Sequence, residues 1–261
     1  MDAPGSLHWC ITDDCNYRCS YCVQGRGRPD RQQGRYATDA CIDAVLRFLD
    51  GLRKGWIVRL SGGEPSLHPR LAEIAEKVAG EGHRLDMETN LSLPLARYED
   101  FLSAAGGRLA NFHASLHREH ADADAFLDKC RSVRKAMDRT GARCGFCVSA
   151  VATRANRAWI ECQAALFEKE GFVFVSQREI VRETFVERDP GGESYRGRPC
   201  LAWKKWLLLD VEGVAWRCHS GFGARGSGGA SLGDVFRGVA LHGEAEACPY
   251  AACHCPGRPV V

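Results

Sequence analysis

The strongest constraint on the fold is an alternation of two hydrophobic patterns over residues 7–180. Six short apolar runs are typical of buried strands, and they are Leu7–Thr12, Trp56–Leu60, Arg84–Thr89, Leu109–Leu116, Cys144–Val151 and Phe172–Ile180. Segments with helical spacing lie between them, at Asp39–Leu49, Leu71–Ala79, Ala125–Thr140 and Ala158–Lys169. Strands that alternate with helices form parallel sheets of βαβ units. The sequence therefore predicts an α/β fold.

The pattern changes near residue 189. Asp189–Pro199 is rich in proline and glycine, and two short apolar runs, Trp206–Leu209 and Val214–Cys218, flank a turn at Glu212-Gly213. Such a pattern predicts a β-hairpin. We therefore expect two domains, a large α/β domain over residues 1–188 and a small hairpin-containing domain over 189–261.

Composition restricts the class of protein. Hydrophobic residues make up 45% of the 261 residues and charged residues 26%, as in ordinary globular proteins. The net charge of +2 gives no general reason to bind nucleic acid or an anionic membrane. No apolar run reaches the roughly 18–20 residues that span a bilayer, and no secretion signal is seen. We expect a cytoplasmic protein with neither a nucleic-acid nor a membrane partner.

The 14 cysteines are abnormal in number and gather near the two ends of the chain. In a reducing compartment, many cysteines indicate metal binding or catalysis. Cys15, Cys19 and Cys22 form a C-x3-C-x2-C motif just after the first predicted strand. Thiolates suit iron–sulfur clusters and zinc, and a cubane cluster with three protein thiolates keeps one iron open. A structural zinc site is the alternative; it needs a fourth ligand, and the next cysteine, Cys41, lies in a predicted helix.

Polar motifs follow the next predicted strands. Ser61–Pro65 follows the second strand, Glu88–Asn90 ends the third, and Ala114–His117 ends the fourth. The carboxyl ends of parallel strands are where such folds place their chemistry. Gly62 and Gly63 let a backbone approach a ligand closely, and Glu64 offers a carboxylate to a cation.

Taken together, these motifs resemble the radical S-adenosylmethionine (radical SAM) superfamily. The similarity extends from about Leu7 to Ile180 and implies a partial (β/α)6 barrel. It implies a 4Fe–4S cluster held by Cys15, Cys19 and Cys22, whose fourth iron is chelated by the methionyl group of S-adenosylmethionine. Electrons would come from a donor such as flavodoxin or ferredoxin. The cofactor would yield a 5′-deoxyadenosyl radical that abstracts a hydrogen atom from the substrate.

The resemblance also implies which residues bind the cofactor. Gly62, Gly63 and Glu64 would receive its amino group, and Thr89, Asn90 and Ser115 fall where the ribose or the carboxylate is often contacted. The full set of expected cofactor-binding residues is Tyr21, Gly62, Gly63, Glu64, Pro65, Thr89, Asn90 and Ser115.

The second group of cysteines lies in the predicted small domain. Cys200 and Cys218 enclose the hairpin in a Cys-x12-Gly-x4-Cys arrangement, and Cys248, Cys253 and Cys255 follow. A zinc knuckle is one interpretation. The arrangement also resembles the SPASM and shorter twitch extensions of radical SAM enzymes. That resemblance implies a β-hairpin/helix domain with one auxiliary 4Fe–4S cluster, with Cys200, Cys218 and Cys255 as first choices of ligand, then Cys253, then Cys248.

The reaction and substrate are predicted from this layout. A substrate radical beside an auxiliary cluster leads to dehydrogenation, whereas a hydrogen donor leads to epimerisation; bond formation or a related C–H functionalisation is the third possible outcome. Cys10, Cys144 and Cys147 are candidate donors, with packing in the core as the alternative for each. His113, His117 and His120 are expected at the surface, and His117 is a candidate acid or base.

The substrate class follows from the same resemblance. The layout is similar to short twitch-bearing enzymes that act on small polar metabolites, such as dehydrogenases of aminocyclitol antibiotic biosynthesis. We therefore expect a sugar, aminocyclitol or nucleoside substrate. Nothing before Leu7 is expected to recognise a leader peptide, but peptide modification remains an alternative. A third alternative is a non-enzymatic zinc-binding module.

Overall fold

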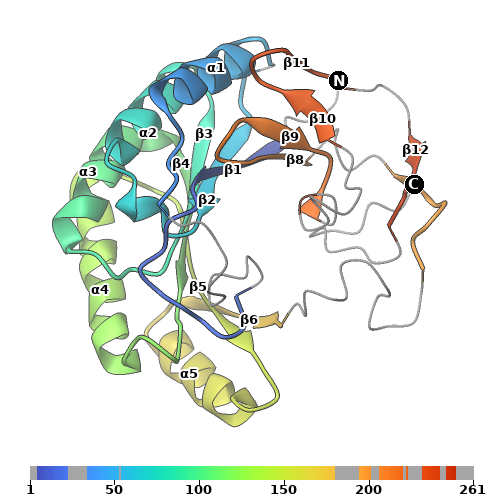
Figure 1. Ribbon diagram of the computed structural model, residues 1–261. Coiled ribbons are helices and arrows are strands. Elements are labelled where there is room, and N and C mark those ends of the chain that lie inside the picture. The colour runs from blue at the N-terminus through green and yellow to red at the C-terminus, as the bar shows by residue number, and fades with distance from the viewer. Residues whose placement is uncertain are drawn as a thin grey trace.

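A curved, mainly parallel sheet forms the centre of the computed structural model, with helices along its outer face (Figure 1). The structure describes residues 5–22, 34–52, 54–179, 194–200, 206–219, 222, 231–241 and 245–250. The strand order of the main sheet is β11-β10-β9-β8-β1-β2-β3-β4-β5-β6. Neighbours from β8 through β1 to β6 pair in parallel, and β8 to β11 pair antiparallel.

The six predicted strands are confirmed, with ends that differ by at most two residues. They are β1 (Ser6–Thr12), β2 (Ile57–Gly62), β3 (Arg84–Thr89), β4 (Leu109–Ser115), β5 (Gly145–Ala152) and β6 (Val173–Arg178). The helices that connect them are α1 (Asp39–Asp50), α2 (Leu71–Gly80), α3 (Leu95–Ala105), α4 (Ala123–Thr140) and α5 (Arg157–Lys169). Two short 3-10 helices are η1 (Pro65–Leu67) and η2 (Gly106–Arg108). The α/β prediction is therefore confirmed, and α3 is the helix that it omitted.

The helix ends follow local chemistry, as α4 illustrates. Asp122 accepts a hydrogen bond from the backbone N–H of Ala125 and so caps the first turn. Gly141 ends the helix in the left-handed conformation with φ of 70°, which a residue without a Cβ adopts at little cost. Phe126, Cys130 and Val133 lie on the buried side of the helix at spacings of four and three residues.

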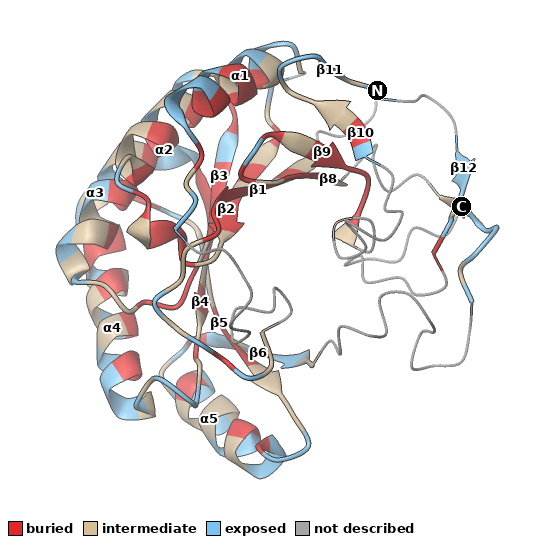
Figure 2. Cartoon of the chain, in the orientation of Figure 1, coloured by how far each residue is buried: buried red, intermediate tan, exposed pale blue. Residues whose placement is uncertain are grey.

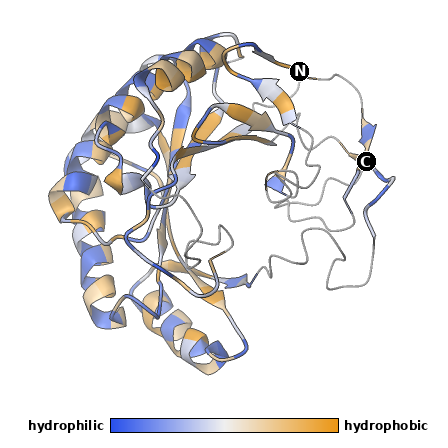
Figure 3. Cartoon of the chain, viewed as in Figure 1, coloured by the Kyte–Doolittle hydropathy of each residue, from blue (hydrophilic) through white to orange (hydrophobic). Residues whose placement is uncertain are grey.

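The core lies between the helices and the sheet (Figure 2). On β1, Leu7, Trp9 and Ile11 are fully buried on the helix side. Alternate residues of a strand point to opposite faces, so His8 and Cys10 belong to the other face. We call this face of β1–β6, opposite α1–α5, the inner face. Apolar residues of the helices gather toward the sheet, and hydrophilic residues gather away from it (Figure 3).

The predicted C-terminal hairpin is present and continues the main sheet. Strand β8 (Trp206–Leu209) pairs antiparallel with β9 (Val214–Trp216), and the turn includes Gly213 at φ of 80°. On its other side β8 pairs in parallel with β1, with Ser6 opposite Trp206. The division at residue 189 stays a prediction, because the hairpin shares a sheet with the α/β part.

Four shorter strands complete the described chain. Strands β10 (Ser231–Asp234) and β11 (Gly238–Val239) extend the sheet beyond β9. Strands β7 (Pro199–Cys200) and β12 (Glu246–Ala247) form a separate antiparallel pair. Within the described residues, the helices are too short or too polar for a transmembrane span.

Candidate active site

The three cysteines of the first motif lie on the loop that leaves β1, here called the cysteine loop (residues 13–22). Its start is attached to the end of β2 by backbone hydrogen bonds. The N–H of Gly63 donates to the carbonyl of Thr12 over 2.8 Å, and that of Glu64 donates to the carbonyl of Asp14 over 2.7 Å. The glycine motif therefore fixes the chain one residue before Cys15.

Gly62 is required at its position by both conformation and packing. Its φ is +126°, and a Cβ there would lie 2.1 Å from the carbonyl oxygen of Thr12. Residues other than glycine rarely adopt such a φ. The close approach of β2 to the end of β1 thus depends on this glycine.

The Glu64 side chain turns inward and joins β2 to the end of β3. It is 1% exposed. Its Oε1 accepts hydrogen bonds from the N–H and hydroxyl of Ser66 and from Thr89 Oγ1, and its Oε2 accepts from the N–H of Asn90 over 2.6 Å. Burial raises the pKa of Glu64, and these hydrogen bonds oppose the rise. In this geometry the carboxylate holds the loop after β3, and Pro65 is buried at the start of η1.

The loop after β3 contacts the cysteine loop directly. Asn90 Nδ2 donates to Asn16 Oδ1 over 3.0 Å, and Asn16 Nδ2 donates to Ser92 Oγ over 2.8 Å. Leu91 adopts a positive φ of 53°, and Lys129 of α4 donates to its carbonyl over 2.7 Å. Asn90 thus contacts the cysteine loop, whereas Thr89 bonds to Glu64 at the end of β3; their contact with the cofactor stays a prediction.

The thiol of Cys19 is the buried member of the motif. Burial raises its pKa to about 12, a hydrogen bond with Tyr21 opposes the rise, and the charges of Cys22 and Cys15 add to it. With Cys15 and Cys22 beside it, Cys19 becomes a thiolate most readily when a cation compensates the charge. This set of soft donors fits a metal cluster, with Cys15, Cys19 and Cys22 as its ligands.

The loop between β4 and α4 packs on the cysteine loop from the other side. Glu119 accepts hydrogen bonds from the N–H and hydroxyl of Ser20, and His120 Nε2 accepts from the N–H of Arg18 over 3.1 Å. His120 also stacks on Tyr17. Among the described residues, Cys19, Glu119 and His120 are the one group of three metal-binding side chains with ligand atoms within 4.8 Å. Glu119 and His120 are already engaged with the loop backbone.

His117 is half-buried against the cysteine loop. Burial lowers its pKa to about 4, with a further lowering from His120 and an opposing effect of Glu119. Of the three histidines expected at the surface, His120 is exposed, whereas His117 and His113 are partly buried. His113 differs because it lies on the inner face of β4 and pairs with Asp86 of β3 over 3.1 Å.

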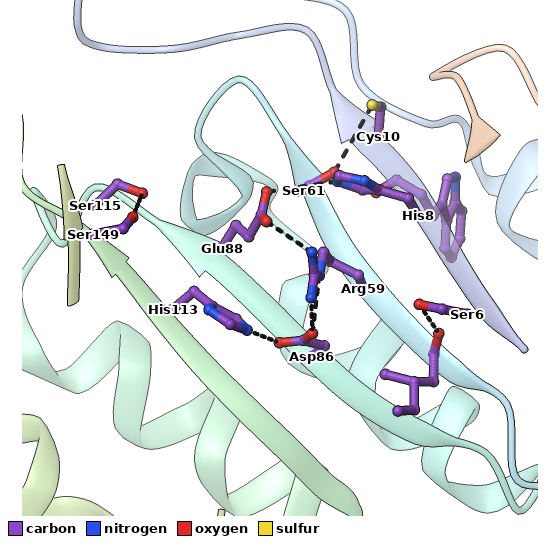
Figure 4. A network of polar contacts seen from close by, with 12 residues as sticks. Ser6, His8, Cys10, Arg59, Ser61, Asp86, Glu88, His113, Ser115 and Ser149 are labelled. Atoms are coloured by element: carbon purple, nitrogen blue, oxygen red, sulfur yellow. Dashed lines mark hydrogen bonds and ion pairs between the residues drawn. The ribbon is translucent and has the colours of Figure 1, made fainter. Parts of the chain in front are cut away.

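A network of charged side chains crosses the inner face of the sheet (Figure 4). Arg59 of β2 bonds Asp86 through two nitrogens, at 2.6 and 2.9 Å, and Glu88 at 3.2 Å. His8 of β1 lies 3.6 Å from Glu88. Burial opposes ionisation of Glu88, but His8 and Arg59 keep its pKa below the usual range. Asp86 is buried, whereas the Glu88 side chain is 36% exposed.

The other predicted inner-face residues lie around this network. Ser115, the last residue of β4, lies opposite Ser149 within β5, and their Oγ atoms are 3.4 Å apart. Cys10 is buried near Ser61, with 3.9 Å between sulfur and oxygen, and packs with Leu208 and Trp216.

Cys147 and Cys144 differ in their surroundings. Cys147 is half-buried and faces His113. Cys144 packs against the main core, and burial, followed by the charge of Asp86, raises its pKa to about 11. Cys147 therefore lies beside His113 on the inner face, whereas Cys144 belongs to the packing of the core.

The C-terminal cysteines that the structure describes come together. Cys200, Cys218 and Cys248 pack around Tyr250. Burial raises the pKa of Cys248, and among the further causes are the charges of Cys200 and Cys218. Cys248, which was ranked last among the expected ligands, thus lies beside Cys200 and Cys218. Cys253 and Cys255 fall outside the described residues.

Several site residues were not found from the sequence. No sequence pattern marks these residues, because they act through contacts between loops that are distant in sequence. They are Asn16, Ser92, Glu119 and Lys129. The inner-face network did have a signal. Arg59 and Ser61, and Asp86 and Glu88, alternate with apolar residues in strands that were expected to be buried, and such alternation marks a polar face.

Comparison with known proteins agrees with this site. The Radical SAM superfamily model matches residues 9–143, which is just over half of the chain. The GTP 3′,8-cyclase of Chlorobaculum tepidum is 32% identical over 132 residues, 49% of this chain and 38% of that protein. The mycofactocin maturase MftC of Mycobacterium ulcerans is 26% identical over 183 residues, 66% of this chain and 46% of that protein. The chain thus spans less than half the length of these relatives.

Solved structures share the fold. The enzyme anSMEcpe, with bound AdoMet and a peptide, superposes with a TM-score of 0.64 and 13% identity over 91% of this chain and 79% of that one. BtrN in complex with AdoMet and 2-DOIA superposes with a TM-score of 0.55 and 15% identity, over 90% of this chain and 79% of that one. The cysteine loop, the glycine motif and the parallel sheet all lie within or beside the matched region, and the chain therefore belongs to the radical SAM superfamily.

Proposed function

We propose that this radical SAM enzyme acts on a small polar metabolite of the sugar, aminocyclitol or nucleoside type. The observation that carries the proposal is the polar inner face of β1–β5. Hydroxyl, carboxylate, imidazole and guanidinium groups replace the apolar residues that would otherwise fill a sheet interior. A site of this kind binds a ligand through several directed hydrogen bonds.

The charges on this face favour a neutral or amine-bearing ligand over a polyphosphate. Arg59 is already bonded to both Asp86 and Glu88, and His113 to Asp86. A polyanion is usually held by cations that are available to it. Glu88, with a side chain that is 36% exposed, offers an acceptor for a hydroxyl or ammonium group.

The cofactor site is proposed at the adjoining end of the sheet. When bound, the 4Fe–4S cluster and S-adenosylmethionine supply the 5′-deoxyadenosyl radical that starts the reaction. Cys15, Cys19 and Cys22 would hold the cluster. The backbone of Gly62 and Gly63, together with Tyr21, Pro65, Thr89, Asn90 and Ser115, would orient the cofactor. Glu64 acts by fixing this geometry.

An auxiliary 4Fe–4S cluster at the C-terminal cysteines completes the proposal. The grouping of Cys200, Cys218 and Cys248 around Tyr250 supports it, and Cys253 and Cys255 are further candidates. Such a cluster would take up the electron that a substrate radical gives up together with a proton, and the product would be dehydrogenated. A low-potential donor such as flavodoxin or ferredoxin would reduce the first cluster. Epimerisation remains the alternative outcome, with Cys147, which lies opposite His113 on the inner face, as the candidate hydrogen donor.

A peptide substrate is the second candidate. It is supported by β6, the edge strand of the sheet in the described part of the chain, where Val173 and Val175 are 63% and 41% exposed. A sheet edge with exposed apolar side chains can accept an extended peptide. Two of the similar proteins are described with a peptide or as a maturase.

The test is anaerobic reconstitution with iron and sulfide, followed by S-adenosylmethionine and dithionite. We expect about eight irons in the two-cluster protein and formation of 5′-deoxyadenosine. Cys19→Ser should abolish the product, whereas Cys162→Ser, at an exposed position on α5, should not. Protein that holds only zinc and gives no 5′-deoxyadenosine would refute the proposal.

The substrate class needs a separate measurement. We expect aminocyclitols, sugars or nucleosides to increase the rate of 5′-deoxyadenosine formation, and Glu88→Gln to reduce that increase. Stimulation by unstructured peptides but by none of the metabolites would favour the second candidate. Transfer of deuterium from solvent into the product would indicate epimerisation rather than dehydrogenation.

A further inference from the structure

His117 lies against the cysteine loop with its ring held by two aromatic residues of that loop. It stacks on Tyr21 at a centroid distance of 6.0 Å and an angle of 13°, and it meets Tyr17 edge-on at 5.7 Å. Its Nδ1 atom lies 3.4 Å from Cys19 Sγ and 3.1 Å from Tyr21 Oη. The same ring nitrogen therefore faces a motif cysteine and the hydroxyl beside it.

The positions of the protons follow from the chemistry of this triangle. A cysteine that ligates a cluster is a thiolate, which only accepts hydrogen bonds. The Tyr21 hydroxyl also shares a hydrogen bond with Cys19. If Nδ1 carried a lone pair, that lone pair would face the thiolate at 3.4 Å and repel it. The tautomer with the proton on Nδ1 lets both His117 and Tyr21 donate toward the sulfur.

We propose that His117 is a positioning residue that donates its Nδ1–H to the thiolate of Cys19 and to the hydroxyl of Tyr21, and thereby raises the reduction potential of the cluster. The inference rests on the proposed role of Cys15, Cys19 and Cys22 as cluster ligands. Reduction adds one negative charge to the cluster. Hydrogen bonds to its sulfur ligands stabilise the reduced form more than the oxidised form.

The rest of the β4–α4 loop has a different role in this arrangement. Glu119 and His120 bind the backbone of Ser20 and Arg18 and so set the distance between the two loops. Hydrogen bonds made by Glu119 end on Ser20, one residue away from Cys19. The negative charge of Glu119 also acts on Cys19, so a neutral residue at position 119 is expected to shift the cluster potential in the direction opposite to loss of the His117 donor.

The test compares His117→Phe with His117→Asn. Phenylalanine keeps a ring that can stack on Tyr21 but has no N–H, whereas the asparagine amide places an N–H near the position of Nδ1. The midpoint potential is measured by anaerobic redox titration of the reduced-cluster electron paramagnetic resonance signal. The relevant signal is the one that changes on addition of S-adenosylmethionine, because only an open iron binds it.

We expect His117→Phe to reduce the ratio of reduced to oxidised cluster about tenfold at a fixed solution potential, which corresponds to about 59 mV for one electron. His117→Asn should restore most of this ratio. Tyr21→Phe, which removes only the hydroxyl, should also lower the ratio of reduced to oxidised cluster. It replaces His117→Phe in the test if that variant does not load iron. Glu119→Gln is the contrasting variant: it removes a negative charge that acts on Cys19, so it should raise the midpoint rather than lower it.

Two outcomes would overturn the inference, and they are distinguishable from failure of the proposed function. An equal midpoint in the native, His117→Phe and Tyr21→Phe proteins would remove the electronic role while the cluster remains. Equal shifts in His117→Phe and His117→Asn would show that bulk rather than the N–H matters. If the native protein bound no iron through Cys15, Cys19 and Cys22, the cluster assignment itself would be wrong.

Discussion

The backbone N–H of Asn90 donates to Oε2 of the buried Glu64 over 2.6 Å and so joins the ends of β3 and β2. The other oxygen of Glu64 accepts from Ser66 and Thr89. A charged acceptor with this many donors orders the loop that contacts the cysteine loop. The site thus depends on a carboxylate that is buried away from it.

Replacing Glu64 by glutamine should destabilise the protein. The amide nitrogen of the new side chain would face donors from Asn90 or from Ser66 and Thr89, so at least one hydrogen bond is lost. Because hydrogen bonds to charged groups contribute about 1.5–3 kcal/mol each, a loss of that order is expected. Urea unfolding measures it. Glu73→Gln, on the exposed side of α2, should change stability by less than about 1 kcal/mol, and equal effects of both variants would contradict the assignment.

Replacing Gly62 by alanine should disturb the start of the cysteine loop. The new Cβ would lie 2.1 Å from the Thr12 carbonyl oxygen at a φ of +126°. The backbone strain alone costs about 1–3 kcal/mol, so we expect lower stability and reduced iron loading. Thermal unfolding and iron analysis check this. Gly107→Ala is the control, since nothing lies within 4 Å of its Cβ, and retention of full iron loading in Gly62→Ala would argue against the role of the glycine.

Much of the fold was predictable because its signals are local. Each parallel strand of the α/β part carries apolar residues in a continuous or alternating pattern, and four of the five connecting helices have clear periodicity. The spacing of Tyr98, Phe101, Leu102 and Ala105 was also a helical signal, and α3 could have been predicted from it. The pairing of β8 with β1 joins Trp206 to Ser6, far apart in the sequence, and no local pattern encodes that contact.

In the candidate site, too, some residues could be predicted from local sequence and others could not. Cys15, Cys19, Cys22 and the Gly62–Glu64 segment are visible as spaced motifs, because their chemistry requires fixed residue types. The contacts of Asn16 with Asn90 and of Ser20 with Glu119 depend on where loops meet after folding. Cys248 was ranked low because spacing alone favoured the hairpin and tail cysteines, whereas the pairing of β12 with β7 places it beside Cys200.

Breaking the inner-face ion pair should be costly. Arg59→Met would leave Asp86, whose side chain is 1% exposed, without its guanidinium partner. Removing one member of a buried pair typically costs about 3–5 kcal/mol. The double variant Arg59→Met with Asp86→Asn should recover part of this loss, because the uncompensated charge is gone. Arg131→Met, in an exposed pair on α4, is the control; an additive double variant in urea unfolding would contradict the coupling.

His113 should make stability depend on pH in the alkaline range. Burial disfavours its charged form, but hydrogen bonds with Asp86 and Cys147 and the charge of Asp86 outweigh burial and the opposing charge of Arg59, so its pKa rises to about 9. Because this pKa is above the usual value of about 6.5, the protonated ring stabilises the fold fully below about pH 6.5. That contribution is lost as the pH rises through about 9. Urea unfolding at several pH values between about 6 and 10 should show a decrease that is absent in His113→Asn, and parallel curves for the two proteins would show that another group is responsible.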